Sequence, residues 1–251
     1  MKQILFWLDK AFWLCMLVYS NMEELMMLRP VVVTKQPRYR EIAYEAIKDA
    51  ILSGKLPVAD ALTEEGLAAQ LNISRTPVRE ALALLEHEQL IAPKGRGLFV
   101  RQISRDEFIE MFVANEQIEP YLARRAAICA TNEHLAVLRN AITQARASAC
   151  EGEVDFAGFL RASRNFHRGV GEAAGNSVLM NFVVRNEERA DMYLLTAGRQ
   201  PNVTSLCASN DEHAAILEAI EQGDPDTAAR LVIYHAQSLR LRFGTLFTQG
   251  D

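Results

Sequence analysis

Two arginines at the start of one predicted helix have the type and the spacing for reading DNA bases. Arg75 and Arg79 are four residues apart, so they lie on one face of a helix whose apolar stripe faces the other way. The fork of an arginine matches the O6 and N7 acceptors of guanine. The neighbouring hydroxyl residues Ser74 and Thr76 suit phosphates or either type of base. These four residues are candidate DNA contacts.

A short basic turn follows this helix. Apolar runs at residues 90–92 and 98–100 flank the segment 93–97, which contains two glycines and is typical of a tight hairpin. Lys94 and Arg96 stand at its tip. We expect them to contact phosphates or the minor groove beside the base-reading helix.

Three histidines are candidate metal ligands. His167, His213 and His235 each lie on the apolar stripe of a different predicted helix. An antiparallel bundle turns such stripes toward one axis, so we expect the three imidazoles to converge. Converging imidazoles suit Zn²⁺, Ni²⁺ or a similar divalent ion. For each histidine the structural alternative is a hydrogen-bonded residue of the core.

The elements that must position the two arginines form a winged helix-turn-helix. Apolar residues recur at helical spacing over residues 40–54, and Thr63 before two glutamates is a good N-cap for a second helix. Ser74 begins the third helix, with Pro77 in its first turn, where proline is tolerated. Two helices joined by a short turn and followed by a basic hairpin predict a DNA-binding domain over residues 35–102.

The remainder, residues 103–251, is predicted to be helical throughout. A capping box at residues 104–107 begins the first helix, and Asp224-Pro225 supplies an N-cap and first-turn proline for the last. The fold class is therefore mainly α, with an N-terminal winged helix-turn-helix followed by an antiparallel bundle of about six helices. The predicted helices span about 104–130, 131–150, 155–174, 177–196, 203–220 and 225–247.

Charge is divided unequally between these two parts. The whole chain has a formal net charge of −5, but residues 35–102 carry ten Lys and Arg against nine Asp and Glu, whereas residues 103–251 carry fourteen against twenty. An acidic part repels a phosphate backbone, so DNA contact is confined to a few well-placed cations of the first part. The helical part is left for a different partner.

The cysteines and the N-terminal segment exclude two other classes. The four cysteines have no CxxC spacing, which excludes a zinc ribbon and favours reduced thiols of a cytoplasmic protein. Residues 1–34 are predicted as an extension without a domain pattern. Its apolar runs 4–8 and 11–19 are interrupted by charges, whereas a spanning helix needs about 20 apolar residues. An over-long gene start or a loosely held helix is favoured over a membrane anchor, so we expect deletion of residues 1–26 to leave DNA binding intact.

Residues 39–101 resemble the DNA-binding domain of GntR-type regulators, through LTEEGLAAQLNISRTPVREALALLEHEQLI and GRGLFV. Residues 104–247 resemble the sensing domain of the FadR-like (FCD) subfamily, through Ile118-Glu119-Pro120 and Asn165-Phe166-His167. The resemblance implies a homodimer on operator DNA. It also implies a divalent metal held by three histidines and an acidic residue, with a small organic acid completing the coordination.

Some positions depart from the family pattern. Ser163 stands one turn before His167, where an acidic ligand is expected, and Asn115 stands where many members have an arginine that grips the effector. Both residues are expected to border the effector pocket, and their identity makes an uncharged effector a rival to an organic acid. Gln89 stands where the family usually has glycine. Four arginines of the helical part are expected to be solvated surface charges: Arg164, Arg168, Arg185 and Arg189.

Together these features predict a cytoplasmic repressor or activator whose helical domain binds a small metabolite, with a divalent metal as its cofactor. Two alternatives stay open. One is a DNA-binding regulator without an effector, whose bundle serves only dimerisation. The other is a metalloenzyme that uses the three histidines, although no carboxylate stands one turn from His167 to act as a general base. Metal analysis of the purified protein would separate them.

Overall fold

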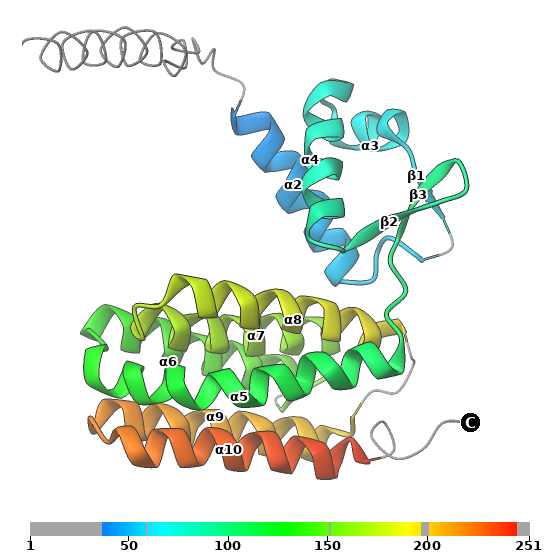
Figure 1. The fold of residues 1–251 in the computed structure, drawn as a ribbon. Coiled ribbons are helices and arrows are strands. Elements are labelled where there is room, and N and C mark those ends of the chain that lie inside the picture. The colour runs from blue at the N-terminus through cyan, green and yellow to red at the C-terminus, as the bar shows by residue number, and fades with distance from the viewer. Residues whose placement is uncertain (1–36, 59, 151, 197–200, 245–251) are drawn as a thin grey trace, which may run out of the picture. The chain divides into compact units, whose positions relative to one another are not determined.

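The computed structural model describes residues 37–58, 60–150, 152–196 and 201–244 (Figure 1). The predicted extension at residues 1–34 lies outside these residues. The described elements are helices α2 to α10 and one three-stranded sheet. None of the described helices is long and apolar enough to cross a membrane.

Three helices form the first part of the described chain. They are α2 (Pro37–Leu52), α3 (Glu64–Leu71) and α4 (Arg75–His87). The Thr63 hydroxyl accepts a hydrogen bond from the Gly66 amide, which satisfies one free amide at the start of α3. Asn72 ends α3 in the left-handed region with φ of 53°, a conformation that asparagine tolerates well. Thr63 therefore fixes the start of α3, and Asn72 ends it and begins the short turn to α4.

The sheet forms the wing. Its strands are β1 (Ala61–Leu62), β2 (Ile91–Lys94) and β3 (Gly97–Val100), antiparallel in the order β1-β3-β2. Gly95 and Arg96 make a two-residue turn between β2 and β3, with Gly95 at φ of 62°. Pro93 is tolerated because β2 is an edge strand. The sequence predicted the hairpin of β2 and β3. It did not predict β1, because a strand of two residues is too short to show an alternating pattern of apolar and polar residues.

Buried aliphatic side chains hold the helices and the sheet of this part together. Ile47 of α2, Leu85 of α4 and Ile91 of β2 are each at most 2% exposed. Burial of a side chain of this size contributes roughly 1.5–3 kcal/mol. The apolar stripe of α4 at Val78, Leu82 and Leu85 is buried as well, as the helical period of the sequence indicated.

Gln89, between α4 and β2, adopts φ of 62°. This is the left-handed region, which costs a residue with a side chain roughly 1–2 kcal/mol. The family's usual glycine at this place has no such cost. The chain therefore tolerates backbone strain in the connection that leads from the recognition helix into the wing.

Six described helices form the second part, an antiparallel bundle (Figure 1). Helix α7 packs against α6 and α8, while α5 packs against α8 and α10, and α9 packs against α6 and α10. The structure thus has the predicted fold class, a winged helix-turn-helix followed by a mainly antiparallel helical bundle. The six helices are α5 (Arg105–Cys129), α6 (Asn132–Ala149), α7 (Phe156–Ala173), α8 (Ser177–Thr196), α9 (Val203–Glu221) and α10 (Pro225–Arg242).

The helix starts follow side-chain caps. Asp224 accepts a hydrogen bond from the amide of Thr227 and begins α10, as predicted. Ser104 likewise caps α5, but the predicted capping box there is wrong: the Glu107 carboxylate contacts Arg101 and Arg189 instead. A complete box occurs at the start of α6, where Thr131 and His134 bond each other's backbone amides.

A disulfide joins Cys150 to Cys207, with their Cα atoms 5.9 Å apart. The prediction that the cysteines are reduced thiols is therefore wrong for this pair, while Cys129 is free and exposed. Cys150 ends α6 and Cys207 lies in the first turns of α9. Spacing along the chain did not reveal the pair because 57 residues separate two positions that helix packing makes adjacent.

Candidate functional site

The exposed face at the start of α4 carries the predicted base-reading residues. Ser74, Arg75, Thr76 and Arg79 are all exposed, while Pro77 and Val78 turn into the core. Ser74 occupies the N-cap position in an extended conformation but makes no side-chain cap hydrogen bond. The sequence therefore places four donor side chains on one solvent-facing surface at a helix N-terminus, an arrangement suited to the major groove.

One carboxylate contacts both arginines, a feature that the sequence reasoning missed. Glu64, the first residue of α3, accepts hydrogen bonds from Nε and Nη2 of Arg79 at 2.9 and 3.1 Å. Nη2 of Arg75 lies 3.8 Å from the same carboxylate. The hydrogen bond from Arg79 lowers the pKa of Glu64. Spacing gave no signal for this contact because fifteen residues separate Glu64 from Arg79.

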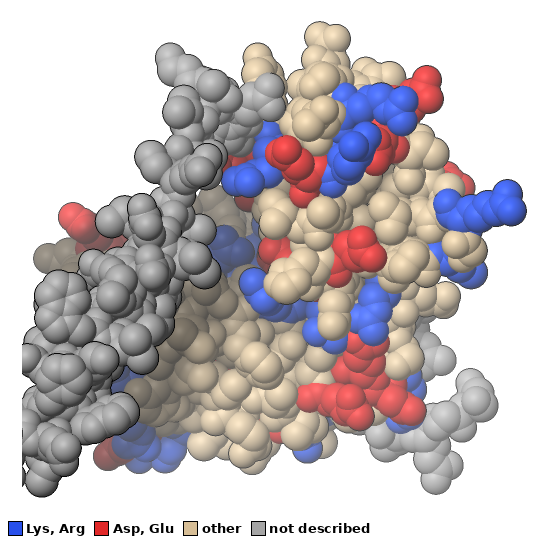
Figure 2. Space-filling view, turned by 45° about the horizontal axis from the view of Figure 1, so that its top comes forward, with Lys and Arg blue, Asp and Glu red and all other residues tan. Residues whose placement is uncertain are grey.

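The wing tip presents Lys94 and Arg96, both exposed on either side of Gly95. On the face drawn in Figure 2, basic and acidic side chains are interspersed rather than gathered in one basic surface. This face therefore offers a phosphate backbone a few placed cations rather than a broad basic surface.

The structure brings His167 of α7, His213 of α9 and His235 of α10 together inside the bundle. One ligand nitrogen of each lies within 4.8 Å of the others. Nε2 of His213 is 3.2 Å from Nε2 of His235, and the rings of His167 and His213 are 5.0 Å apart, edge to face. His213 and His235 are 1% and 2% exposed.

Carboxylates lie behind two of these imidazoles. Nδ1 of His235 is 2.7 Å from the Glu212 carboxylate, which Arg242 holds with two hydrogen bonds of 2.7 Å. Nδ1 of His167 lies 3.4 Å from both Glu119 and Glu187. A carboxylate on Nδ1 selects the tautomer whose Nε2 lone pair is free and orients the ring, as it does behind metal-bound histidines.

The three histidines differ in protonation. Burial lowers the pKa of His213 well below its usual value, and burial likewise lowers the pKa of His235. Burial also disfavours the charged form of His167, but Glu187 and Glu119 outweigh it and raise the pKa of His167 to about 9. Hydrogen bonds from Arg242 and His235 overcome burial and lower the pKa of Glu212 to about 2.

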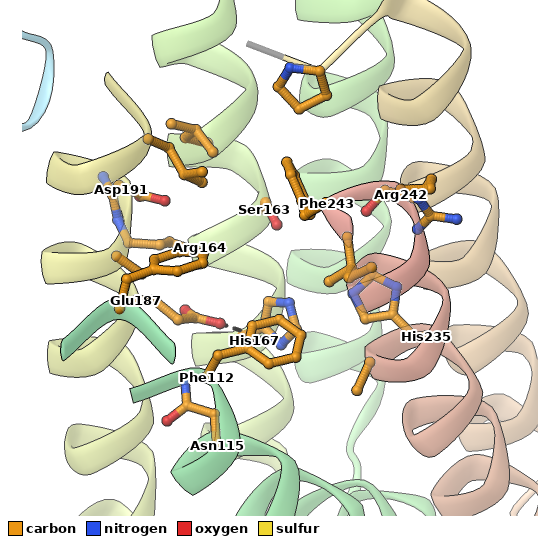
Figure 3. Close-up of a pocket in the computed structure, with 18 of the residues that line it drawn as sticks. Phe112, Asn115, Ser163, Arg164, His167, Glu187, Asp191, His235, Arg242 and Phe243 are labelled. Carbon is orange, nitrogen blue, oxygen red and sulfur yellow. Dashed lines mark hydrogen bonds and ion pairs between the residues drawn. The ribbon is translucent and has the colours of Figure 1, made fainter. Parts of the chain in front are cut away.

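His167 and His235 border a cavity of about 130 Å³ between the helices of the bundle. In Figure 3, His167 and His235 face this cavity from α7 and α10, with Ser163 beside them. Asn115 also lines it, but its side chain is occupied: it donates to the Val183 carbonyl and accepts from Asn186. The rest of the wall is mostly apolar, contributed by Phe108, Phe112, Phe159, Leu194, Leu239 and Phe243.

The prediction of solvated arginines is wrong for two of the four. Arg164 is 8% exposed and pairs with Asp191 inside the cavity wall. Arg189 is partly buried and pairs with Glu107. Arg168 and Arg185 are exposed, as expected. Helical phase alone could not separate these cases, because the partners come from other helices.

The residues present fit a divalent ion. Two nitrogen ligands at roughly 2.0–2.1 Å from a tetrahedral zinc lie about 3.3–3.4 Å apart, close to the 3.2 Å between His213 and His235. Three imidazoles could hold one ion once His167 loses the proton that its raised pKa favours near pH 7. Ser163 lines the same cavity, but its hydroxyl is a weak ligand. Glu119 and Glu187 supply negative charge nearby, in place of the missing acidic ligand.

Comparison with known proteins identifies the family. Residues 39–100 match the GntR family of bacterial regulatory proteins, and residues 110–238 match the FCD domain. The chain belongs to the GntR family. This GntR-family regulator is 30% identical to a probable D-xylose utilization operon transcriptional repressor of Paenarthrobacter nicotinovorans, over 74% of this chain and 80% of that protein. It is 31% identical to the transcriptional repressor NanR of Cronobacter sakazakii, over 70% of this chain and 74% of that protein.

Solved structures share its fold. E. coli McbR/YncC superposes with a TM-score of 0.70 at 18% identity, covering 83% of this chain and 97% of that one. A putative GntR regulator from Rhodococcus sp. RHA1 gives a TM-score of 0.64 at 20% identity, covering 86% of this chain and the whole of that one. The family and the relatives' names are those of transcription regulators, so the chain is not assigned as an enzyme, and the metalloenzyme alternative loses its support.

Proposed function

We propose that this GntR-family protein is a cytoplasmic homodimer that reads operator DNA through α4 and the wing, and that it senses a small metabolite through a divalent metal in the FCD domain. Its relatives carry the names of operon repressors and regulators. The DNA contacts we assign are Ser74, Arg75, Thr76, Arg79, Lys94 and Arg96.

The observation that carries the metal proposal is the pair of Nε2 atoms at 3.2 Å, one of them backed by a carboxylate on Nδ1. Two buried neutral imidazoles with facing nitrogens can share one proton, but a divalent ion would bind the ring nitrogens of both, and that of His167 as well once His167 loses its proton. Zn²⁺ or Ni²⁺ suits three imidazoles. His213 and His235 are neutral near pH 7 and ready to bind, since burial lowers both pKa values.

The cavity favours an effector with an apolar body and one oxygen donor. Both arginines that line the cavity, Arg164 and Arg242, already have carboxylate partners, Asp191 and Glu212. Asn115 takes the place of the arginine that many relatives use. An effector carboxylate or hydroxyl would therefore be held mainly by a metal ion on the three histidines, in the cavity that Ser163 also lines. A compound with several anionic groups would find no unpaired cation in the described wall.

The test is metal content and effector response of the full-length protein. Protein purified without chelator and given one equivalent of zinc should retain about one zinc per chain, by mass spectrometry. The variant His213→Ala/His235→Ala should lose it, whereas His87→Ala, which removes an exposed histidine of α4, should not. Wild-type protein that holds no zinc, or a double variant that holds as much as wild type, would overturn the metal site and leave the regulator without a metal-linked effector.

A further inference from the structure

The carboxylate of Glu64 holds the two DNA-facing arginines of α4 from a different helix. It binds Arg79 through both oxygens, at 2.9 and 3.1 Å, and lies 3.8 Å from Arg75. The side chains of Arg75 and Arg79 are 61% and 66% exposed, whereas that of Glu64 is 28% exposed. The carboxylate is thus the less exposed partner, and it lies on the first turn of α3.

A two-point contact fixes the plane of a guanidinium. Arginine carries five N–H donors, and Glu64 takes one on Nε and one on Nη2 of Arg79. The donors of Nη1 and the second donor of Nη2 stay available. An arginine fixed in this way loses less side-chain entropy when it contacts a base than one that moves freely in solvent.

The same carboxylate opposes unspecific DNA binding. It lies beside two cations that would otherwise pair with any phosphate, and it repels the phosphates themselves. A base contact exploits the orientation that Glu64 imposes, but a phosphate contact gains nothing from it. The two effects act in the same direction on the ratio of specific to unspecific affinity.

We propose that Glu64 is a positioning residue that sets DNA specificity, by orienting Arg79 and Arg75 toward base edges and by withholding them from phosphates. The inference rests on the proposed DNA-reading role of α4. The competing explanation is that the ion pair only joins α3 to α4, in which case its loss would lower stability and leave specificity alone.

The test compares Glu64→Gln with Glu65→Gln. Both variants remove one negative charge from the first turn of α3, and Glu65 is exposed. DNA sites are first enriched from a random pool by the full-length wild-type protein. Affinities of wild type and both variants are then measured for the enriched site and for a scrambled duplex over a range of salt concentrations.

Glu64→Gln should bind scrambled DNA several-fold more tightly and reduce the ratio of specific to unspecific affinity at least tenfold. Glu65→Gln should strengthen both affinities similarly, with a ratio within about twofold of wild type, because its effect is long-range and screened within roughly 8 Å at 0.15 M salt. In an Arg79→Ala background, where little specificity is left to lose, Glu64→Gln should strengthen binding to scrambled DNA much less than it does in the wild type.

Equal ratios for Glu64→Gln and Glu65→Gln would overturn the inference, and so would a full effect of Glu64→Gln without Arg79. A lower melting temperature with an unchanged ratio would identify the pair as a purely structural contact. If wild type itself does not discriminate enriched from scrambled DNA, the DNA-reading role of α4 fails first, and the inference about Glu64 fails with it.

Discussion

The protonation of His167 predicts how the stability of the metal-free protein depends on pH. The perturbation is a rise from pH 6 to pH 9 after removal of metal by chelator. In the folded protein the pKa of His167 is about 9, because Glu187 and Glu119 outweigh its burial. In the unfolded chain it returns to about 6.5. The folded state therefore binds the proton more tightly, and the stabilisation is complete below pH 6.5 and lost as pH rises through 9.

The size of the effect follows from the two pKa values. At about 1.4 kcal/mol per pH unit, the difference between 6.5 and about 9 corresponds to about 3 kcal/mol. About 2 kcal/mol of this should be lost between pH 7 and pH 9. Asp191, whose pKa is raised to about 6 chiefly by burial, changes stability below this window. Burial also raises the pKa of Glu187, which contacts His167, well above its usual value, and a raised carboxyl pKa lowers stability with rising pH in the same direction. The range from pH 7 to 9 therefore reports on the pair of His167 and Glu187.

The assay is urea unfolding of the metal-free protein at several pH values, together with NMR titration of the imidazole signals. His167→Gln should remove most of the slope between pH 7 and 9, and His87→Gln, an exposed histidine, should not. A bound divalent ion requires neutral His167, so metal affinity should increase over the same range. Stability that is constant or increasing with pH in the metal-free protein, or an equal slope in His167→Gln, would refute the reasoning.

Four further changes have defined outcomes. Arg75→Ala or Arg79→Ala should abolish specific operator binding, at about 1–3 kcal/mol for a lost base contact, with fold and dimer intact; unchanged gel-shift titrations would contradict this. Ser163→Asp should raise zinc affinity, measured by competition with a chelator, because it supplies a fourth ligand beside the histidines. Cys150→Ser should lower the free energy of unfolding by up to about 4 kcal/mol, since the disulfide closes a loop of 57 residues, and reductant should have no effect on the variant. Gln89→Gly should stabilise the protein by about 0.5–1 kcal/mol in the same unfolding assay, by relieving the left-handed strain.

Local signals in the sequence predicted the helices well. Thr63 and Asp224 cap helices where their side chains indicated, and the buried stripe of α4 follows its period. The predicted end of the last helix, near residue 247, lies outside the described residues, and α10 is described to Arg242. The strand β1 had no such signal, because its two residues owe their conformation to pairing with β3.

The sequence predicted which histidines face inward from their own helices, but not which residues of other helices they contact. The period placed His167, His213 and His235 on inward faces, and the bundle does bring them together. The carboxylates behind them and the partner of Arg164 were not predicted, because pairs such as Glu212 with Arg242 join different helices. Acidic residues are too common in this chain for one to be singled out without its partner.

The disulfide between Cys150 and Cys207 also determines how the chain would respond to force. It closes the chain around α7 and α8, the helices that carry His167, Ser163 and Glu187. A pull on the two ends of the oxidised protein cannot extend the segment between the two cysteines. That segment would add roughly 190–205 Å of length once the bond is reduced, at 3.3–3.6 Å per residue for 57 residues. The same bond keeps the two fragments joined after a proteolytic cut anywhere between the cysteines.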